Sequence, residues 1–419
     1  MKPDFTTLAE TAVTRCRRLA SFSEDTGSTR RTFLSPPMHD VHREITRWLE
    51  PLGATVRTDA VGNLRAVYPP SKTPASSLLI GSHLDTVPNA GAYDGILGVV
   101  LAVGCLEALQ GERLPYAVEV VGFCEEEGVR FGIPFIGSRA LVGRVDDDLL
   151  NAKDAHGIPL RKAIQDFGLD LREIGRAALR PESCAYLEFH IEQGPVLEKL
   201  GRPLAAVEAI AGQSRWELSF LGRSNHAGTT PMDLRLDAVA AAAEWITLVE
   251  QLGKTAPGLV ATVGSVEVRP GAANVIAAEA RVSLDVRHRE DALRSRAVEN
   301  MILHAEDVAR HRGLSVRSTQ RLNQPAVPMD SLLTCQIEEA IRQTGCPPHR
   351  MVSGAGHDAM ILAEKVPSAM IFLRTPGGIS HDPAESVAVD DVAKAIECGL
   401  GLLHQFASAP TFHSRTCRA

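Results

Sequence analysis

Histidine, aspartate and glutamate residues recur in this sequence directly after apolar segments or inside glycine-containing turns. They are His83 and Asp85 after LLIGS, Asp94 in AYDG, Glu125, Glu126 and Glu127 after VVGFC, His190 in FHIEQG, and His381 in GGISHDPAE. In an open α/β sheet, functional sites gather beyond the carboxyl ends of the strands. Imidazole and carboxylate groups bind divalent cations, and a centre of two cations needs several of them. The pattern therefore predicts a two-metal centre.

Each of these motifs also has an ordinary structural explanation when it stands alone. The His-x-Asp at 83–85 can be a buried structural histidine, and the EEEG run can be a solvated acidic turn. HIEQG can begin a helix in which His190 is exposed and has no function, and His381 beside two glycines can belong to a turn. The metal-centre hypothesis therefore depends on all of these residues occurring together.

The segments around these residues alternate between apolar strands and helices. SSLLIGSHLDTV and YAVEVVGFCEEEG are typical of buried strands, ATVRTDAVGNLRAVYP of a further strand, and ILGVVLAVGCLEALQG of a buried helix. Helices are also expected over His39–Leu52 and near the amino terminus, where apolar residues from Leu8 to Leu19 have nearly helical spacing. This alternation predicts an α/β domain with a mostly parallel central sheet.

The character of the sequence changes near residue 210. SRWELSFLGRSNHAGTTP, LVATVGSVEVRPG and a segment within Ala272–His288 have the half-polar pattern of strands with one solvated face. Helices are expected over Asp237–Leu252 and Asp291–Arg312, so this region predicts two helices on a small antiparallel sheet, an α+β domain. We therefore expect a discontinuous catalytic domain, residues 1–210 and 327–419, with a second domain inserted at 211–326.

Composition argues against several other classes of protein. A chain of 419 residues with 44% hydrophobic and 23% charged residues is typical of a globular protein with two domains. The net charge of −7 and the dispersed Lys and Arg residues argue against nucleic acid as a partner. We expect neither a signal peptide nor a membrane span, because no segment is apolar for long enough. The eight cysteines include no CxxC pair, so most are expected to be buried thiols in a cytoplasmic protein: Cys16, Cys105, Cys124, Cys184, Cys335, Cys346, Cys398 and Cys417.

The ordered series GSHLDTV, YDG, EEEG, FHIEQGPVLE, SGAGHDA and ISHDPAE, together with GRSNHAGTTPM, resembles the amidase branch of the zinc aminoacylase/carboxypeptidase superfamily. That branch contains allantoate amidohydrolase, N-carbamoyl-L-amino acid hydrolase and beta-ureidopropionase. His190 favours this branch, because the matching position of the peptidase branch resembles an acid. The resemblance implies hydrolysis of a ureido or carbamoyl C–N bond in a small carboxylate substrate. It also implies two divalent cations, zinc or manganese, with cobalt and nickel as alternatives.

The resemblance further implies a role for each chemical residue. Asp94 would be the carboxylate that bridges the two cations. The four terminal ligands would be His83, Glu127, His190 and His381. The sequence leaves open which ligands share a cation. Glu126 would be the general base, taking a proton from the attacking water and returning it to the leaving nitrogen. Asp85 would accept a hydrogen bond from His83 and fix its tautomer, whereas Glu125 is given no role.

The inserted domain would act as a lid and as a dimerisation domain that completes the site. His226 would stabilise the oxyanion, Asn274 would bind the substrate, and the Arg287 guanidinium would bind the substrate carboxylate through two parallel hydrogen bonds. The rest of the substrate pocket would come from a glutamine and one loop: Gln193, Ser353, Gly356 and His357. A homodimer is implied, in which His226 and Asn274 can reach the site of the neighbouring subunit.

Three segments depart from the family pattern without removing a ligand. NVIAAEA replaces NVIPG, NAGAYDG replaces a glycine pair before Asp94, and SHDPAE carries an additional acid, Asp382. The exact substrate therefore stays open. Allantoate, with release of ammonia and CO2, is favoured over an N-carbamoyl-L-amino acid. A dipeptidase or aminoacylase is less favoured because of His190, and an inactive binding protein because Glu126 and all the ligands are present.

Overall fold

The computed structural model describes residues 3–73 and 75–408, and the chain divides into two compact units. Unit 1 comprises Met1–Glu208, Met329–Met351 and Gly356–Ala419. Unit 2 comprises Ala209–Pro328 and the short segment Val352–Ala355. Most of unit 2 is therefore one long insertion between two parts of unit 1.

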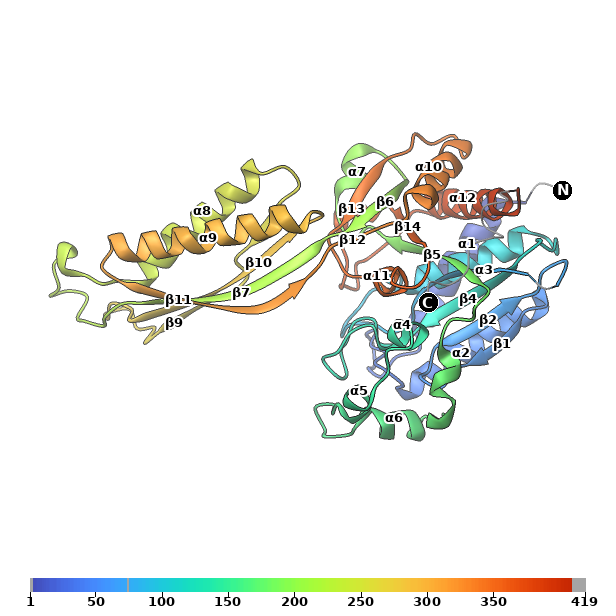
Figure 1. Ribbon diagram of the computed structural model, residues 1–419, viewed down its shortest axis with the longest axis horizontal. Helices are drawn as coiled ribbons and strands as arrows, with labels where there is room; N and C mark the ends of the chain where they lie inside the picture. The colour runs from blue at the N-terminus through green and yellow to red at the C-terminus, as the bar shows by residue number, and fades with distance from the viewer. Residues whose placement is uncertain (1–2, 74, 409–419) are drawn as a thin grey trace. The chain divides into compact units, whose positions relative to one another are not determined.

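Within the described residues, the larger sheet has nine strands (Figure 1). Their order is β1-β2-β4-β3-β5-β14-β6-β12, and β13 also pairs with β6. The central strands β4, β3, β5 and β14 run parallel to one another, whereas the pairs that flank them are antiparallel. The prediction of a mostly parallel central sheet is confirmed. The strands are β1 (Thr55–Thr58), β2 (Leu64–Tyr68), β3 (Ser77–His83), β4 (Ala117–Phe123), β5 (Ser183–Ile191), β6 (Leu204–Ile210), β12 (Val327–Pro328), β13 (Arg350–Ser353) and β14 (Ser368–Leu373).

Helices cover the central strands, and every residue of β3, β4, β5 and β14 is buried. Parallel strands that are covered on both faces have continuous runs of apolar residues, and these runs made the strands predictable from the sequence. Helix α3 packs against β3 and β5, and α1 and α12 pack against α3 and against each other. The helices of unit 1 are α1 (Phe5–Ala20), α2 (Pro36–Leu49), η1 (Glu50–Leu52), α3 (Ile96–Ala108), α4 (Ile136–Leu141), α5 (Asp147–Asn151), α6 (Leu160–Asp166), η2 (Leu171–Ala177), α7 (Val196–Leu200), α10 (Ser331–Gln343), α11 (Asp358–Leu362), η4 (Pro376–Gly378) and α12 (Val389–Ser408).

One prediction for unit 1 was wrong. ATVRTDAVGNLRAVYP was expected to be a single strand, but it forms the antiparallel hairpin of β1 and β2. The carboxylate of Asp59 accepts hydrogen bonds from the backbone N–H groups of Val61, Gly62 and Asn63. Gly62 has a φ of +102°, which residues with a side chain rarely adopt. These local contacts close a turn in the middle of the segment.

Unit 2 contains a five-stranded antiparallel sheet, in the order β11-β7-β10-β8 with β9 also paired to β10. Helices α8 and α9 pack against each other and against β7 and β10, as predicted. Strand β11 was not predicted, because most of its residues are exposed and polar and show no apolar alternation. The elements are β7 (Gly212–Leu221), η3 (Met232–Leu234), α8 (Ala238–Thr255), β8 (Val260–Thr262), β9 (Val266–Arg269), β10 (Glu279–His288), α9 (Asp291–His311) and β11 (Ser315–Gln324).

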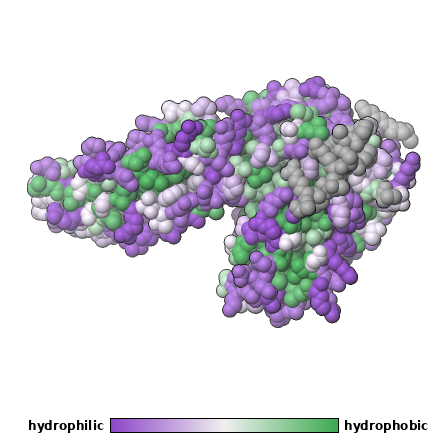
Figure 2. Space-filling view, viewed as in Figure 1, coloured by the Kyte–Doolittle hydropathy of each residue, from purple (hydrophilic) through white to green (hydrophobic). Residues whose placement is uncertain are grey.

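Most of the described cysteines are buried thiols. Five of the seven described cysteines are buried and none of the seven forms a disulfide, whereas Cys417 lies outside the described residues. Among the described helices, none has both the length and the apolar character needed to cross a bilayer. Hydrophilic residues cover much of the face in Figure 2, with smaller hydrophobic areas between them.

Substitution of Gly98 tests the close packing of α3 on the central strands. A Cβ atom at this position would lie 2.1 Å from the Phe189 carbonyl oxygen and 2.7 Å from the Ser82 Cβ. We expect Gly98→Ala to lower the free energy of unfolding by about 1–3 kcal/mol, because the helix must move away from the sheet. Urea denaturation of the metal-free protein measures this change.

Gly175→Ala is the matched control, because a Cβ atom there would have no neighbour within 4 Å. This variant is expected to stay within about 0.5 kcal/mol of the parent protein. Equal stabilities of the two variants would contradict the packing argument.

Candidate metal centre

The predicted ligands lie at one edge of the larger sheet because neighbouring parallel strands end there. His83 is the last residue of β3, and His190 is the penultimate residue of β5. Glu127 follows the end of β4, and His381 follows β14. Asp94 lies just before α3, whose N-cap Gly95 has a φ of +67°. A Cβ at this glycine would lie 2.4 Å from the His83 ring, so glycine allows the Asp94 turn to pass beside the imidazole.

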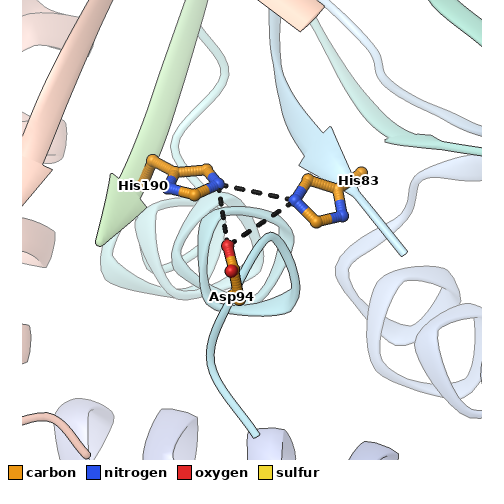
Figure 3. A group of neighbouring side chains, drawn as sticks. All are labelled: His83, Asp94 and His190. Atoms are coloured by element: carbon orange, nitrogen blue, oxygen red, sulfur yellow. Dashed lines mark hydrogen bonds and ion pairs between the residues drawn. The ribbon is translucent and has the colours of Figure 1, made fainter. Parts of the chain in front are cut away.

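The first triplet of ligand atoms consists of His83, His190 and Asp94 (Figure 3). The Nε2 atoms of the two histidines lie 3.4 Å apart. Asp94 Oδ1 lies 3.2 Å from His190 Nε2 and 3.8 Å from His83 Nε2. All three side chains are buried. Their ligand atoms converge on one point, as a shared cation requires.

The second triplet consists of Asp94, Glu127 and His381. His381 Nε2 lies 3.2 Å from Asp94 Oδ2 and 3.4 Å from Glu127 Oε1. The side chain of His381 is 48% exposed, so this side of unit 1 is open to solvent. The sequence left the grouping of the ligands open. The structure has three groups of side chains that could hold a cation, and two of them share Asp94, the geometry of a bridging carboxylate. The third group consists of His83, Glu126 and Glu127.

Backbone carbonyl groups fix the tautomers of the two buried histidines. His83 Nδ1 lies 3.0 Å from the Asp85 carbonyl oxygen, and His190 Nδ1 lies 2.9 Å from that of Ile191. A carbonyl oxygen can only accept, so each Nδ1 is the donor. Each Nε2 is then the nitrogen that faces Asp94. Histidine ligands of metals usually donate their other N–H in this way.

The donor set fits two cations. Asp94 Oδ1 is buried and has no hydrogen-bond partner among the described residues, although two imidazole nitrogens face it. Burial lowers the pKa of His190 to about 4, and the nearby His83 adds to this effect although Asp94 opposes it. His190 is therefore neutral at physiological pH, as a ligand must be. The residues of both triplets could thus hold metal ions.

The carboxylates impose strong and opposite electrostatic effects on one another and on His83. Burial disfavours the charged imidazole of His83, but Asp94, Glu126 and Asp85 outweigh burial and raise its pKa well above the usual value. Burial raises the pKa of Glu127 to about 7, with Asp94 adding to the effect and His83 opposing it. Without cations, this cluster therefore holds protons near neutral pH.

Asp85 has a different contact from the one expected. Its carboxylate lies 3.9 Å from His83 Nδ1, too far for a hydrogen bond, and its backbone carbonyl accepts that proton instead. The two carboxylate oxygens accept hydrogen bonds from the backbone N–H groups of Glu126, at 3.0 Å, and Glu127, at 3.1 Å. The expectation that its side chain fixes the His83 tautomer is therefore wrong. That side chain holds the backbone of the glutamate pair.

Glu125 has a structural function that the sequence analysis did not assign. It is fully buried, with a φ of +54°. Its carboxylate accepts backbone hydrogen bonds from Phe33, Arg130 and Phe131. These contacts hold the loop after β4 that carries Glu126 and Glu127. The sequence signal was the unusual run of three acids directly after a buried strand, of which only two were needed for chemistry.

Gln193 and His357 lie beside the metal triplets. Gln193 Nε2 donates to Asp94 Oδ2 at 2.9 Å, so the amide contacts the shared ligand in addition to any contact with substrate. The His357 ring is buried and lies 4.5 Å from the His190 ring, edge to face. A Cβ atom at Gly356 would lie 2.9 Å from Phe135 Cζ, which explains the glycine. Ser353 belongs to unit 2, where its hydroxyl donates to the Ala355 carbonyl.

His226 and Asn274 lie side by side in unit 2. His226 forms a β-bridge with Val275, and the Asn274 carbonyl accepts a hydrogen bond from Ala227 N. His226 Nδ1 accepts a hydrogen bond from Gly228 N at 3.0 Å, so the ring proton of the neutral imidazole is on Nε2. The structure thus brings together His226 and Asn274, which are almost fifty positions apart in the sequence. The His226 ring is exposed, and its Nε2–H is free to donate a hydrogen bond.

The guanidinium of Arg287 is already engaged by a carboxylate. Its Nε and Nη2 atoms donate to the two oxygens of Asp285 at 2.8 and 3.0 Å, and Nη1 donates to the Gly354 carbonyl at 2.6 Å. Gln213 and Arg215 also donate to Asp285. Arg287 therefore has the orientation and charge for binding a carboxylate, and in this structure that carboxylate is the one of Asp285.

Comparison with known proteins places the chain in a family. Residues 79–405 match the family model of peptidase family M20/M25/M40. The chain belongs to this family. It is 36% identical to a probable allantoate deiminase of Oryza sativa subsp. japonica, over 95% of this chain and 88% of that protein. It is 38% identical to an N-carbamoyl-L-amino acid amidohydrolase of Geobacillus stearothermophilus, over 84% and 87% of the two chains.

The fold of this M20 family member agrees with solved structures. The crystal structure of an amidase of the hydantoinase/carbamoylase family from Burkholderia multivorans matches with a TM-score of 0.90 and 30% identity, covering 96% of this chain and 98% of that one. The family depends on metal ions, and the two triplets form a candidate metal-binding cluster. This M20 family member is therefore a hydrolase that acts on C–N bonds.

Metal binding is expected to release protons. Glu127, whose pKa is raised to about 7, and His83, whose pKa is raised well above its usual value, must lose their protons, so metal affinity rises as the pH increases through about 7 and falls as the solution becomes more acidic. Calorimetric titration of the chelator-treated protein with Mn²⁺, in buffers of different ionisation enthalpy, counts the protons released. A heat of binding that is the same in every buffer would contradict this assignment.

Proposed function

We propose that this chain is a two-metal amidohydrolase that hydrolyses the ureido C–N bond of a small carboxylate substrate, with allantoate as the first candidate. The observation that carries the proposal is the pair of ligand triplets that share Asp94, with Glu126 buried directly beside Glu127. When bound, the two cations would supply Lewis acidity to the substrate carbonyl and lower the pKa of the attacking water.

Glu126 acts as the general base in this proposal. Burial raises the pKa of its carboxyl well above the usual value, and the Glu127, Asp358 and Asp85 carboxylates add to the effect although His83 opposes it. A carboxylate with a raised pKa accepts a proton from water more readily and can return it to the leaving nitrogen. The backbone hydrogen bond from Glu126 N to Asp85 fixes the position of this base.

The residues of unit 2 act on the substrate. His226 Nε2–H donates to the oxyanion that develops when water attacks the ureido carbonyl, which the neutral tautomer permits. Arg287 binds the substrate carboxylate, and Asn274 and Ser353 are the other substrate-binding residues of this unit. Unit 1 contributes Gln193, Gly356 and His357 to substrate binding. Cleavage of the C–N bond leaves a carbamate that decomposes to ammonia and CO2.

Allantoate is placed first because the plant allantoate deiminase matches nearly the whole chain, 95%, against 84% for the N-carbamoyl-L-amino acid amidohydrolase. The second enzyme has the slightly higher identity, 38% against 36%, which supports an N-carbamoyl-L-amino acid as the second candidate. Both substrates carry a ureido group and a carboxylate, so the same ligands and the same Arg287 serve either one.

The test of the substrate is direct. The purified protein is stripped with chelator, reloaded separately with Mn²⁺, Zn²⁺ or Co²⁺, and assayed for ammonia released from allantoate and from N-carbamoyl-L-methionine. Metal-dependent release from allantoate supports the first candidate. A strong preference for N-carbamoyl-L-methionine would replace it by the second, and cleavage of dipeptides alone would move the chain to the peptidase branch.

We further propose a cytoplasmic homodimer formed through unit 2. Several large hydrophobic side chains are exposed on this smaller unit, and hydrophobic areas are visible among the hydrophilic residues in Figure 2. These side chains are Met232, Leu234, Val239, Val260, Val266, Leu293 and Leu303. A homodimer interface would bury exposed apolar side chains of this kind. Light scattering of the purified protein measures the mass in solution.

Glu126→Gln should separate metal binding from catalysis. The amide keeps the shape of the side chain but cannot accept the proton, so kcat is expected to fall by at least about 10²–10⁴-fold. Metal content, measured by mass spectrometry, should stay at two ions per chain. Full activity in this variant would rule out Glu126 as the base.

Arg287→Lys should weaken substrate binding. Lysine keeps the positive charge but loses the planar fork that binds a carboxylate through two parallel hydrogen bonds, so KM should rise by about tenfold or more with a smaller change in kcat. Arg215→Lys is the control, because Arg215 also pairs with Asp285 but is 54% exposed. An unchanged KM in Arg287→Lys would show that Arg287 does not bind the carboxylate.

A further inference from the structure

The loop that carries His381 holds Asp94 by its backbone as well as by its side chain. Glu385 Oε1 accepts hydrogen bonds from the backbone N–H of Asp94 at 2.9 Å and of Tyr93 at 2.7 Å. The hydroxyl of Ser380 donates to Asp94 Oδ2 at 2.9 Å. One short loop therefore fixes both the backbone N–H and the carboxylate of Asp94, the residue that the two ligand triplets share.

The loop has internal contacts that make Glu385 a defined anchor. The Asp382 carboxylate accepts a hydrogen bond from Ala384 N at 2.8 Å, and its backbone carbonyl accepts one from Glu385 N at 3.0 Å. The acid that departs from the family pattern thus closes the turn between His381 and Glu385. Glu385 itself is only 5% exposed, so water cannot readily replace it.

The segment before Asp94 has a glycine, Gly91, where the Glu385 side chain packs against it. A Cβ atom at Gly91 would lie 2.4 Å from the Glu385 Cβ and 2.6 Å from its Oε1. Gly91 does not have a positive φ, so its backbone conformation does not require a glycine. The close approach of the Glu385 side chain explains why this residue has no side chain of its own. The chain before Asp94 therefore leaves the space that the Glu385 side chain occupies.

We propose that Glu385 is a positioning residue for the metal centre, which sets the place of Asp94 relative to His381 through the backbone of Tyr93 and Asp94. This inference rests on the metal centre of the proposed function. Asp94 contributes one oxygen to each triplet, so a displacement of its backbone weakens both cation positions at once. A carboxylate that is not itself a ligand, but accepts two hydrogen bonds from the backbone at Asp94, thereby controls metal affinity.

Metal binding by substituted proteins tests this proposal without any substrate. Glu385→Ala removes the acceptor, whereas Glu385→Gln keeps an oxygen that can accept both N–H groups but removes the charge. Affinity for Co²⁺ is measured by competition with a chromophoric chelator, the stoichiometry by mass spectrometry, and the ligand geometry by the visible absorption of the bound Co²⁺. Thermal unfolding of the metal-free forms reports on the fold.

Asp330→Ala is the matched control. Asp330 also accepts two backbone hydrogen bonds, from Leu332 and Leu333 at the start of α10, and its own N–H donates to Ser368 at the amino end of β14. This variant should lose thermal stability and keep its affinity for Co²⁺. Gly91→Ala is a second probe, since it keeps Glu385 but forces it away from Asp94.

The expected result is a loss of Co²⁺ affinity of about 10–100-fold in Glu385→Ala, a loss in the same direction in Gly91→Ala, and near-parental affinity in Glu385→Gln. An unchanged affinity and Co²⁺ spectrum in Glu385→Ala would overturn the proposal. An equal loss in Glu385→Ala and Glu385→Gln would also overturn it, because the site would then need the charge and not the acceptor. Since no substrate is used, these results do not depend on which ureido compound the enzyme hydrolyses.

Discussion

The concentration of buried carboxylates at one edge of the parallel sheet is the constraint on which the rest of unit 1 depends. Asp85, Asp94, Glu125 and Glu126 are all buried beside the ends of β3 and β4. Removing such charges from water is very unfavourable unless they are paired with cations or strong hydrogen-bond donors. Parallel strands place these residues together, and the site must then supply positive charge. Metal ions would provide it for the ligands, and backbone N–H groups are the partners of the Asp85 and Glu125 carboxylates.

The acids that are not ligands share one structural principle. Asp85, Glu125 and Glu385 each accept two or more backbone N–H groups from a segment that carries ligands or the base. A carboxylate that accepts backbone hydrogen bonds is a strong and directional anchor. The loop after β4 is thereby held by Asp85 and Glu125, and the segment before α3 is held by Glu385. This arrangement keeps flexible turns in the geometry that a metal centre needs.

The sequence predicted which side chains gather at the sheet edge but not their internal arrangement. The candidate residues followed from residue types at strand ends, which the continuous apolar strands made visible, and the role of each as a ligand followed from the family resemblance. The grouping into two triplets, the contact of Gln193 with Asp94 and the true partner of Asp85 all depend on side-chain directions, which a sequence does not contain. The hairpin at Asp59 and strand β11 were missed for a related reason, because local hydrogen bonds and polar edge strands leave little periodic signal.

Under the proposed role of Arg287, its pairing with Asp285 gives the enzyme an internal competitor for the substrate carboxylate. The apparent dissociation constant of a carboxylate bound there equals the intrinsic constant divided by the fraction of molecules in which the guanidinium is released. Only a ligand that offers two well-placed oxygens recovers the hydrogen bonds that Asp285 gives up. A monodentate anion would not, so under this proposal the internal pair would favour a substrate that offers two oxygens over ordinary anions.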